Sequence, residues 1–204
     1  KDNYIVDLLK TKQDQLRNFK VNKYKFDEII KIIAKEISKG KVIGWFQGGM
    51  EFGPRALGNR SILCDPRNPN MKSILNNKIK RRESFRPFAP SILREEVKDW
   101  FEHDDDVPFM MKIFKFKKNK MQLIPAVVHN DGTGRLQTVT KESNEMYYNL
   151  IREFYKLTNI PMLLNTSFNE NEPIVCKPEE ALDCFLRTNM DIIVLQNHII
   201  SRSK

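Results

Sequence analysis

The sequence predicts a mixed α/β fold in which a twisted, mixed β-sheet packs against flanking helices. Segments with helical spacing of apolar residues are interspersed with short apolar runs that are typical of buried strands. The chain has 204 residues, of which 40% are hydrophobic, and this is enough for one domain with a substantial core. Helices and strands do not alternate strictly and no internal repeat appears, so we expect a mixed sheet.

The first 25 residues are polar and are expected to form a linker or lead-in helix outside the core, with residues 26–204 forming the domain. Apolar residues in this lead-in have only loosely helical spacing, whereas those after it line one face of a clear helix that ends before Gly40. The two sets are Ile5, Leu8, Leu9 and Leu16 in the lead-in, and Ile29, Ile30, Ile33 and Ile37 in the helix.

The remaining elements follow from apolar runs, capping residues and turn signals. Asn68-Pro69 predicts a helix start, Ser143 is expected to cap a later helix, and Pro178 opens the last one. The expected helices cover residues 69–79, 95–101, 143–157 and 178–188. The expected strands cover residues 42–46, 61–64, 109–116, 124–129, 135–140, 162–164, 192–195 and 198–200.

A glycine-rich loop over residues 48–61 is the most informative segment of the chain. Four of the eight glycines fall within eleven residues, and Gly53-Pro54-Arg55 combines conformational freedom, a stiff neighbour and a fixed cation. Such a loop suits an anion such as phosphate. A plain tight connection between two strands explains the spacing equally well, because the motif matches neither a P-loop nor a dinucleotide fingerprint.

A second segment interleaves basic residues with aromatic residues and prolines. Its basic residues are Lys78, Lys80, Arg81, Arg82 and Arg86, and the run Phe85–Ser91 overlaps and follows them. Arginine binds phosphate through a planar fork and lysine through a point charge, so the segment suggests a polyphosphate pocket. A nucleic-acid patch and ordinary surface charge remain the alternatives.

Two further polar segments follow expected strands or connect them. Arg135 could bind phosphate and Asp131 could orient it or help to hold magnesium, although Asp131-Gly132 is also a common hairpin turn. Asn165, Thr166 and Ser167 come directly after an apolar strand and are well placed to contact a ligand. A capped turn is the simpler explanation for that triplet taken alone.

Charge and composition narrow the function. The formal net charge is +9, which indicates an anionic partner such as a nucleotide, a nucleic acid or an acidic domain. The three cysteines and three histidines lack metal-site spacing and the cysteines are expected to be reduced and buried, so we expect a cytoplasmic protein without a metal site of its own. No apolar run suits a membrane span. The motifs contain arginine, lysine, amide and hydroxyl groups, which suit charge stabilisation at phosphorus.

Taken together and in this order, the motifs resemble the C-terminal domain of the NodU/CmcH family of O-carbamoyltransferases. The resemblance covers about residues 26–200, and four ordered motifs make it specific. The four matching motifs are Gly44–Gly48 with Met50–Ser61, Lys80–Ser91, Asp131–Val139, and Asn165–Asn169 with Glu172–Val175.

The resemblance implies a YrdC-like α/β fold that forms carbamoyl adenylate from ATP and carbamoyl phosphate, with Mg²⁺ bound mainly through the phosphates. Transfer to a hydroxyl acceptor belongs to an actin-like ATPase-type N-terminal domain, which these residues do not contain and whose metal is not expected here. Carried over by motif, Lys80 and Arg86 would contact the carbamoyl and phosphate groups. The expected nucleotide and phosphate contacts are Gly53, Arg55, Arg135, Asn165, Thr166 and Ser167.

Three positions depart from the family pattern. The family usually has histidine where Arg81 stands, proline where Ser84 stands and glycine where Asn171 stands. Asparagine tolerates the left-handed region, so the last change is compatible with the same turn. The alternative function is a basic RNA-binding module or a YrdC-like module related to tRNA modification, with Phe85 and Phe88 stacking on bases.

Overall fold

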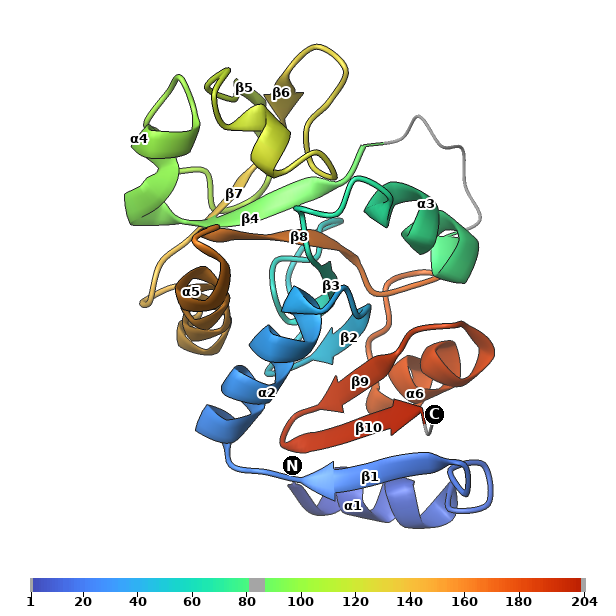
Figure 1. Ribbon diagram of the computed structural model, residues 1–204. Helices are drawn as coiled ribbons and strands as arrows, with labels where there is room; N and C mark the ends of the chain where they lie inside the picture. The colour runs from blue at the N-terminus through green and yellow to red at the C-terminus, as the bar shows by residue number, and fades with distance from the viewer. Residues whose placement is uncertain (1, 81–86, 203–204) are drawn as a thin grey trace.

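A mixed eight-stranded β-sheet runs through the molecule, as the computed structural model shows for residues 2–80 and 87–202 (Figure 1). The β2–β9 and β4–β7 pairs are parallel and the other neighbours are antiparallel. In spatial order the strands are β1 (Phe19–Lys23), β10 (His198–Arg202), β9 (Ile192–Leu195), β2 (Ile43–Phe46), β3 (Arg60–Cys64), β8 (Met162–Ser167), β4 (Ala89–Leu93) and β7 (Gln137–Val139).

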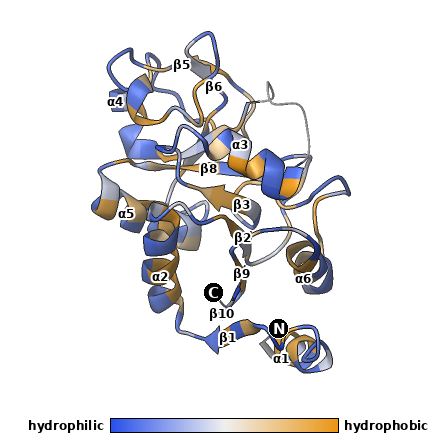
Figure 2. Ribbon diagram, turned by 45° about the vertical axis from the view of Figure 1, so that its right-hand side comes forward, coloured by the Kyte–Doolittle hydropathy of each residue, from blue (hydrophilic) through white to orange (hydrophobic). Residues whose placement is uncertain are grey.

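Helices cover both faces of this sheet, and the expectation of a mixed sheet with flanking helices is confirmed. Helices α2 (Phe26–Ser38) and α5 (Glu145–Thr158) lie side by side on one face, and α6 (Pro178–Arg187) lies on the opposite face (Figures 1 and 2). Their apolar faces point inward, as the hydropathy colouring in Figure 2 shows. Burial of these faces against a largely apolar sheet supplies the main stabilisation of the fold.

Local sequence signals explain where the helices begin and end. Helix α2 buries the predicted isoleucine face, and Gly40 follows its end with φ of +83°. Helix α5 starts one residue later than expected: the side chain of Asn144, rather than Ser143, accepts a hydrogen bond from the Tyr147 amide at 3.1 Å. Asn159 ends α5 in the left-handed region, which asparagine tolerates.

The N-terminal segment takes more part in the fold than expected. The lead-in helix is present as α1 (Asp2–Thr11), but residues 19–23 form the unpredicted edge strand β1. Ile5, Leu8 and Leu16 are buried, so the expectation that these side chains lie outside the core is wrong. These three side chains belong to the same core cluster as the sheet, and Lys12 in this segment pairs with Asp183 of the distant α6 at 3.4 Å.

Other elements differ from the sequence-based expectations. The strand expected at 109–116 is reduced to β5 (Phe114–Lys115), which pairs with β6 (Thr133–Gly134). Residues 124–129 form no strand, and a turn covers residues 125–127. The helix expected at 69–79 starts later as α3 (Met71–Leu75) and continues as the π-helix η1 (Asn76–Lys80). Strand β4 was not predicted at all. Short helices complete the structure: η2 (Arg94–Glu96), α4 (Val97–Trp100) and η3 (Met121–Leu123).

The cysteines and the helix lengths bear on two further expectations. Cys64 and Cys184 are buried free thiols as expected, whereas Cys176 is exposed. Among the residues that the structure covers, no helix has the length and apolar character that crossing a membrane requires. The loop between β2 and β3 contains the glycine-rich motif and leads to the candidate site.

Candidate functional site

One carboxylate organises the glycine-rich loop between β2 and β3. Glu51 Oε1 accepts hydrogen bonds from the backbone amides of Leu57, Asn59 and Arg60 at 2.8, 2.6 and 3.2 Å. A carboxylate that accepts several backbone N–H groups holds the chain more firmly than neutral acceptors do. The loop is therefore fixed around Glu51 before any ligand binds.

Two glycines in this loop have backbone conformations that other residues rarely adopt. Gly53 has φ of +104° and lies beside open space, so its conformation rather than close packing requires glycine. Gly58 has φ of +111°, and a Cβ atom there would lie 2.2 Å from the ring of Tyr147. Gly58 therefore lets the loop pack directly on α5.

The loop brings Arg55 to a small cavity that four other predicted site residues also line. The cavity has a volume of about 100 Å³ and is lined by Arg55 from the loop, Arg135 after β6, and the last three residues of β8, Asn165, Thr166 and Ser167. The prediction placed these three residues directly after a strand ending at residue 164, but they extend β8 itself, where pairing with β3 holds them in register. Segments distant in sequence thus converge at one point.

Neither arginine in this cavity has a side-chain partner among the described residues. Within residues 2–80 and 87–202, no hydrogen bond or ion pair is formed by the side chains of Arg55 or Arg135, and both Nε atoms are buried. Burial lowers the pKa of the Arg135 guanidinium, and the charge of Arg55 lowers it further. Two uncompensated guanidinium groups in a small cavity form a site for an anion with several acceptor oxygens.

A buried polar network lies directly behind the small cavity. Ser91 on β4 donates to Gln137 Oε1 on β7 at 2.6 Å, and both are register partners on these parallel strands. Asn165 Nδ2 lies 3.0 Å from Ser91 Oγ and 3.1 Å from Gln137 Oε1. The same two amides donate to the carbonyl groups of Ala56 and Leu57 at 3.1 and 2.8 Å. The network therefore holds the loop that carries Arg55 from its carbonyl side.

A second, larger cavity of about 540 Å³ adjoins the first, and Pro54 and Arg55 line both. Its walls include apolar side chains of Phe52 and Phe109, both of which are otherwise exposed to solvent. Polar groups such as Asn59 also face it. An apolar cavity with a few polar groups beside a cationic pocket is typical of a nucleotide site.

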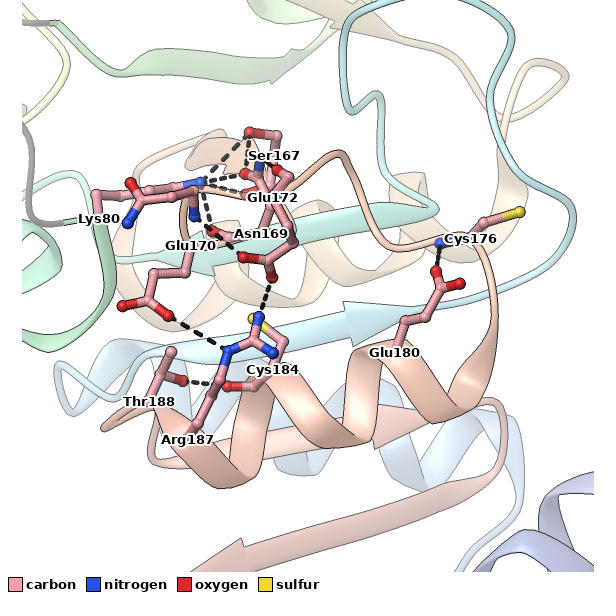
Figure 3. A network of polar contacts seen from close by, with 11 residues as sticks. Lys80, Ser167, Asn169, Glu170, Glu172, Cys176, Glu180, Cys184, Arg187 and Thr188 are labelled. Atoms are coloured by element: carbon pink, nitrogen blue, oxygen red, sulfur yellow. Dashed lines mark hydrogen bonds and ion pairs between the residues drawn. The ribbon is translucent and has the colours of Figure 1, made fainter.

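Lys80 contacts Ser167, which lines the small cavity, and Asn169 (Figure 3). The side chain is buried, and Nζ donates to the carbonyl oxygens of Ser167 and Asn169 at 2.7 and 2.8 Å and to Asn169 Oδ1 at 2.7 Å. Lys80 ends the π-helix η1, a feature that occurs frequently at functional sites. The geometry assigns it a positioning contact, and its predicted catalytic role stays a prediction.

The other predicted residues have different positions. Arg86 lies outside the described residues, and Gly53 shapes the loop without lining either cavity. Asp131 accepts hydrogen bonds from the amide and hydroxyl of Thr133, at 3.0 and 2.7 Å, and lines neither cavity. The described part of the chain contains no group of three metal-ligating side chains.

The residues that the sequence-based prediction missed are Glu51, Ser91 and Gln137. All three lie inside the segments that carry the family resemblance, and this was the available signal. Glu51 and Gln137 bond backbone groups of the loop, and Ser91 bonds the side chains of Gln137 and Asn165; no local pattern shows these contacts.

The alternative nucleic-acid patch loses several of its components. Phe88 is buried and Lys80 is only 4% exposed, so neither is available to stack on or pair with a nucleic acid. Lys78 pairs with Asp191 at 2.8 Å. The other basic residues of that run, and Phe85, lie outside the described residues.

Comparison with known proteins agrees with the motif pattern. The family model described as "Carbamoyltransferase C-terminus" matches residues 34–202. Nodulation protein NolNO of Sinorhizobium fredii is 47% identical over 180 residues, which cover 86% of this chain and 26% of that protein. Nodulation protein NolO of Bradyrhizobium diazoefficiens is 46% identical, covering 86% of this chain and 33% of that protein. The chain thus spans between a quarter and a third of the length of these relatives.

Solved structures show the same fold at low sequence identity. HypF of T. kodakarensis matches with a TM-score of 0.58 and 17% identity, covering 92% of this chain and 24% of that one. E. coli YciO matches with a TM-score of 0.54 and 18% identity, covering 83% of this chain and 78% of that one. The fold is the YrdC-like α/β fold that the resemblance implied. The family match and the relatives together show that the chain belongs to the NodU-type carbamoyltransferase family and contains its C-terminal domain.

Proposed function

We propose that this domain forms carbamoyl adenylate from ATP and carbamoyl phosphate. The observation that carries the proposal is the pair Arg55 and Arg135, whose side chains share a small cavity without any counter-charge from the described residues. Such a pair is unfavourable without a ligand, because both charges are partly desolvated and repel each other. A phosphate group offsets this cost by accepting charge-assisted hydrogen bonds from both.

The two cavities divide the substrates between them. The cavity of about 100 Å³ suits a small anion such as carbamoyl phosphate, and that of about 540 Å³ accommodates the adenosine part of ATP. Arg55 lines both cavities, so its guanidinium lies where the phosphate chains of the two substrates would meet. It would offset the repulsion between two polyanions, which opposes their reaction in water.

The reaction balances as two steps. Water attacks the phosphorus of carbamoyl phosphate, the bond from that phosphorus to the carbamoyl oxygen breaks, and carbamate and inorganic phosphate form. The protons of the water remain on phosphate or pass to solvent. A carbamate oxygen then attacks the α-phosphorus of ATP, and the bond to the bridging oxygen breaks to release pyrophosphate. The protein contributes position and positive charge rather than a nucleophile. Enclosure matters because carbamate and its adenylate decompose in bulk water.

Magnesium fits this scheme mainly as an ion bound by the substrates. The described residues contain no group of three carboxylate, histidine or cysteine side chains placed to hold a metal ion, and the carboxylate of Glu51 already accepts three backbone N–H groups. Mg²⁺ retains several waters and binds through phosphate oxygens with few protein ligands. When bound it neutralises charge on the departing pyrophosphate.

The complete enzyme would pass the carbamoyl group to a hydroxyl acceptor. This chain spans only part of the length of its relatives, and the resemblance assigns transfer to an N-terminal domain of actin-like ATPase type. The acceptor is therefore selected elsewhere, and the expected product of this chain is enzyme-bound carbamoyl adenylate.

Pyrophosphate release over single-turnover times, with ATP and Mg²⁺, tests the proposal. Release is expected to require carbamoyl phosphate and to fall strongly in Arg135→Ala, Lys80→Ala and Arg86→Ala. Arg152→Ala is the charge-matched control, because Arg152 is exposed on α5 and lines neither cavity. Equal release with and without carbamoyl phosphate would indicate another ATP-cleaving reaction and contradict the proposal.

A further inference from the structure

Asn165 lines the small cavity together with the two arginines, and it carries a buried acceptor. Its Oδ1 atom is almost fully buried and accepts no hydrogen bond from the described residues, and the residue as a whole is 1% exposed. Leaving such an atom unpartnered is unfavourable, and native proteins rarely do so without a functional reason. The cavity therefore presents two donors for oxygen atoms and one acceptor that requires an N–H or O–H group.

The orientation of the Asn165 amide follows from its neighbours. Nδ2 donates to the carbonyl oxygen of Ala56 at 3.1 Å. If the amide were rotated by half a turn, Oδ1 would face that carbonyl oxygen instead, and neither oxygen can donate a hydrogen bond. Gln137 is fixed in the same way, because its Nε2 donates to the Leu57 carbonyl at 2.8 Å and leaves Oε1 to face Asn165.

Nδ2 of Asn165 has no hydrogen left to donate to a ligand. It has two hydrogens and three acceptors within 3.1 Å, namely Ala56 O, Ser91 Oγ and Gln137 Oε1. The only group of Asn165 left for a bound molecule is thus the acceptor Oδ1. Because Oδ1 can only accept hydrogen bonds, it repels phosphate and carbonyl oxygens, and its ligand partner must be a donor.

We propose that Asn165 selects the carbamoyl group by accepting a hydrogen bond from its amine. The inference rests on the proposed function, since it assigns carbamoyl phosphate to this cavity. Among the groups of carbamoyl phosphate, only the –NH₂ group is a hydrogen-bond donor when the phosphate is ionised, while the remaining oxygens suit Arg55 and Arg135. An acetyl group of similar size has a methyl group in that place and leaves Oδ1 unpartnered.

Ser91 and Gln137 act as positioning residues in this arrangement. They occupy Nδ2 and so hold Oδ1 toward the ligand, and Gln137 also holds the carbonyl of Leu57 in the arginine loop. Amine recognition and phosphate binding therefore share one buried framework. A site that hydrogen-bonds a substrate N–H group discriminates strongly against an analogue that lacks it.

Calorimetric titration with two stable phosphonates tests the proposal on the complete chain. Phosphonoacetamide carries the amine, and acetonylphosphonate has a methyl group instead. The wild-type chain is expected to bind phosphonoacetamide at least about tenfold more tightly, the effect of losing one buried hydrogen bond. Asn165→Leu should lower this ratio to near one, whereas Arg135→Ala should weaken both ligands and keep the ratio.

The outcomes separate this inference from the proposed function. Binding of both phosphonates with equal affinity by the wild-type chain would overturn the selection by Asn165 while phosphate recognition stands. Binding of neither would overturn both. If Asn165→Leu does not fold, Asn165→Ser retains a small polar group beside the loop carbonyl, and an unchanged ratio in that variant would likewise contradict the proposal.

Discussion

Replacing Arg135 by methionine is expected to stabilise the ligand-free protein and to remove its anion binding. Both effects have one physical cause. The Arg135 guanidinium is partly desolvated beside Arg55, and burial together with that like charge lowers its pKa. Methionine keeps most of the apolar stem and the volume but removes the charge.

The magnitude follows from the partial exposure of the side chain. Arg135 is half-buried, so solvent screens much of the repulsion, and relief of roughly 0.5–1 kcal/mol is expected. In a domain of this size, that raises the melting temperature by about 1–4 °C. A ligand at about 100 times its Kd adds about 2.7 kcal/mol to the wild type, and the variant should gain little of this.

Thermal unfolding with and without phosphonoacetamide measures both effects in one experiment. Arg67→Met is the matched control, because Arg67 binds the buried carboxylate of Asp65 with Nε at 2.9 Å and Nη2 at 2.6 Å. That variant should lose roughly 2–3 kcal/mol, since it leaves a buried charge unpaired. The reasoning is refuted if Arg135→Met destabilises the ligand-free protein as Arg67→Met does, or if it retains the ligand-induced stabilisation.

Three further predictions concern the loop and its surroundings. Gly58→Ala should lower the free energy of unfolding, measured with urea, by about 2–4 kcal/mol, because the new Cβ would lie 2.2 Å from the Tyr147 ring at a residue with positive φ. A loss below about 1 kcal/mol would contradict the loop geometry. Glu51→Gln should weaken phosphonate binding by about tenfold in calorimetry with the fold retained, because three backbone amides lose a charged acceptor; unchanged affinity would show that the loop needs no such anchor. Burial lowers the pKa of His129, so the folded state disfavours protonation of its ring. The contribution of His129 to stability is therefore complete above about pH 6.5 and falls as the pH decreases through the unfolded-state pKa. His129→Gln should flatten the pH dependence of the unfolding midpoint between about pH 5 and pH 7, whereas an unchanged slope would show that other groups cause it.

Local patterns predicted the elements whose signals lie within a few residues. The isoleucine face of α2 and the helix opened by Pro178 appear as expected, because side chains three and four residues apart share a helix face and proline suits a first turn. The apolar runs of β2 and β9 likewise form adjacent buried strands. The glycine-rich loop was identified by composition alone.

Elements that depend on distant partners were missed or misplaced. Strand β1 is polar and exposed, and only its pairing with β10, at the other end of the chain, makes it a strand. Strand β4 contains Pro90, which argues against a strand from local propensity. Residues 109–113 have the composition of a strand, yet Phe109 and Met111 are exposed and line the larger cavity.

The sequence by itself determined the family, the order of its motifs and which of their residues carry positive charge or hydrogen-bonding groups. Only the tertiary structure decided which of these groups meet. Arg55 and Arg135 are 80 positions apart, and they line one cavity together with the end of β8, which extends through Ser167. The free acceptor of Asn165 could not be predicted either, because it results from three hydrogen bonds to separate segments that fold together only in the complete sheet.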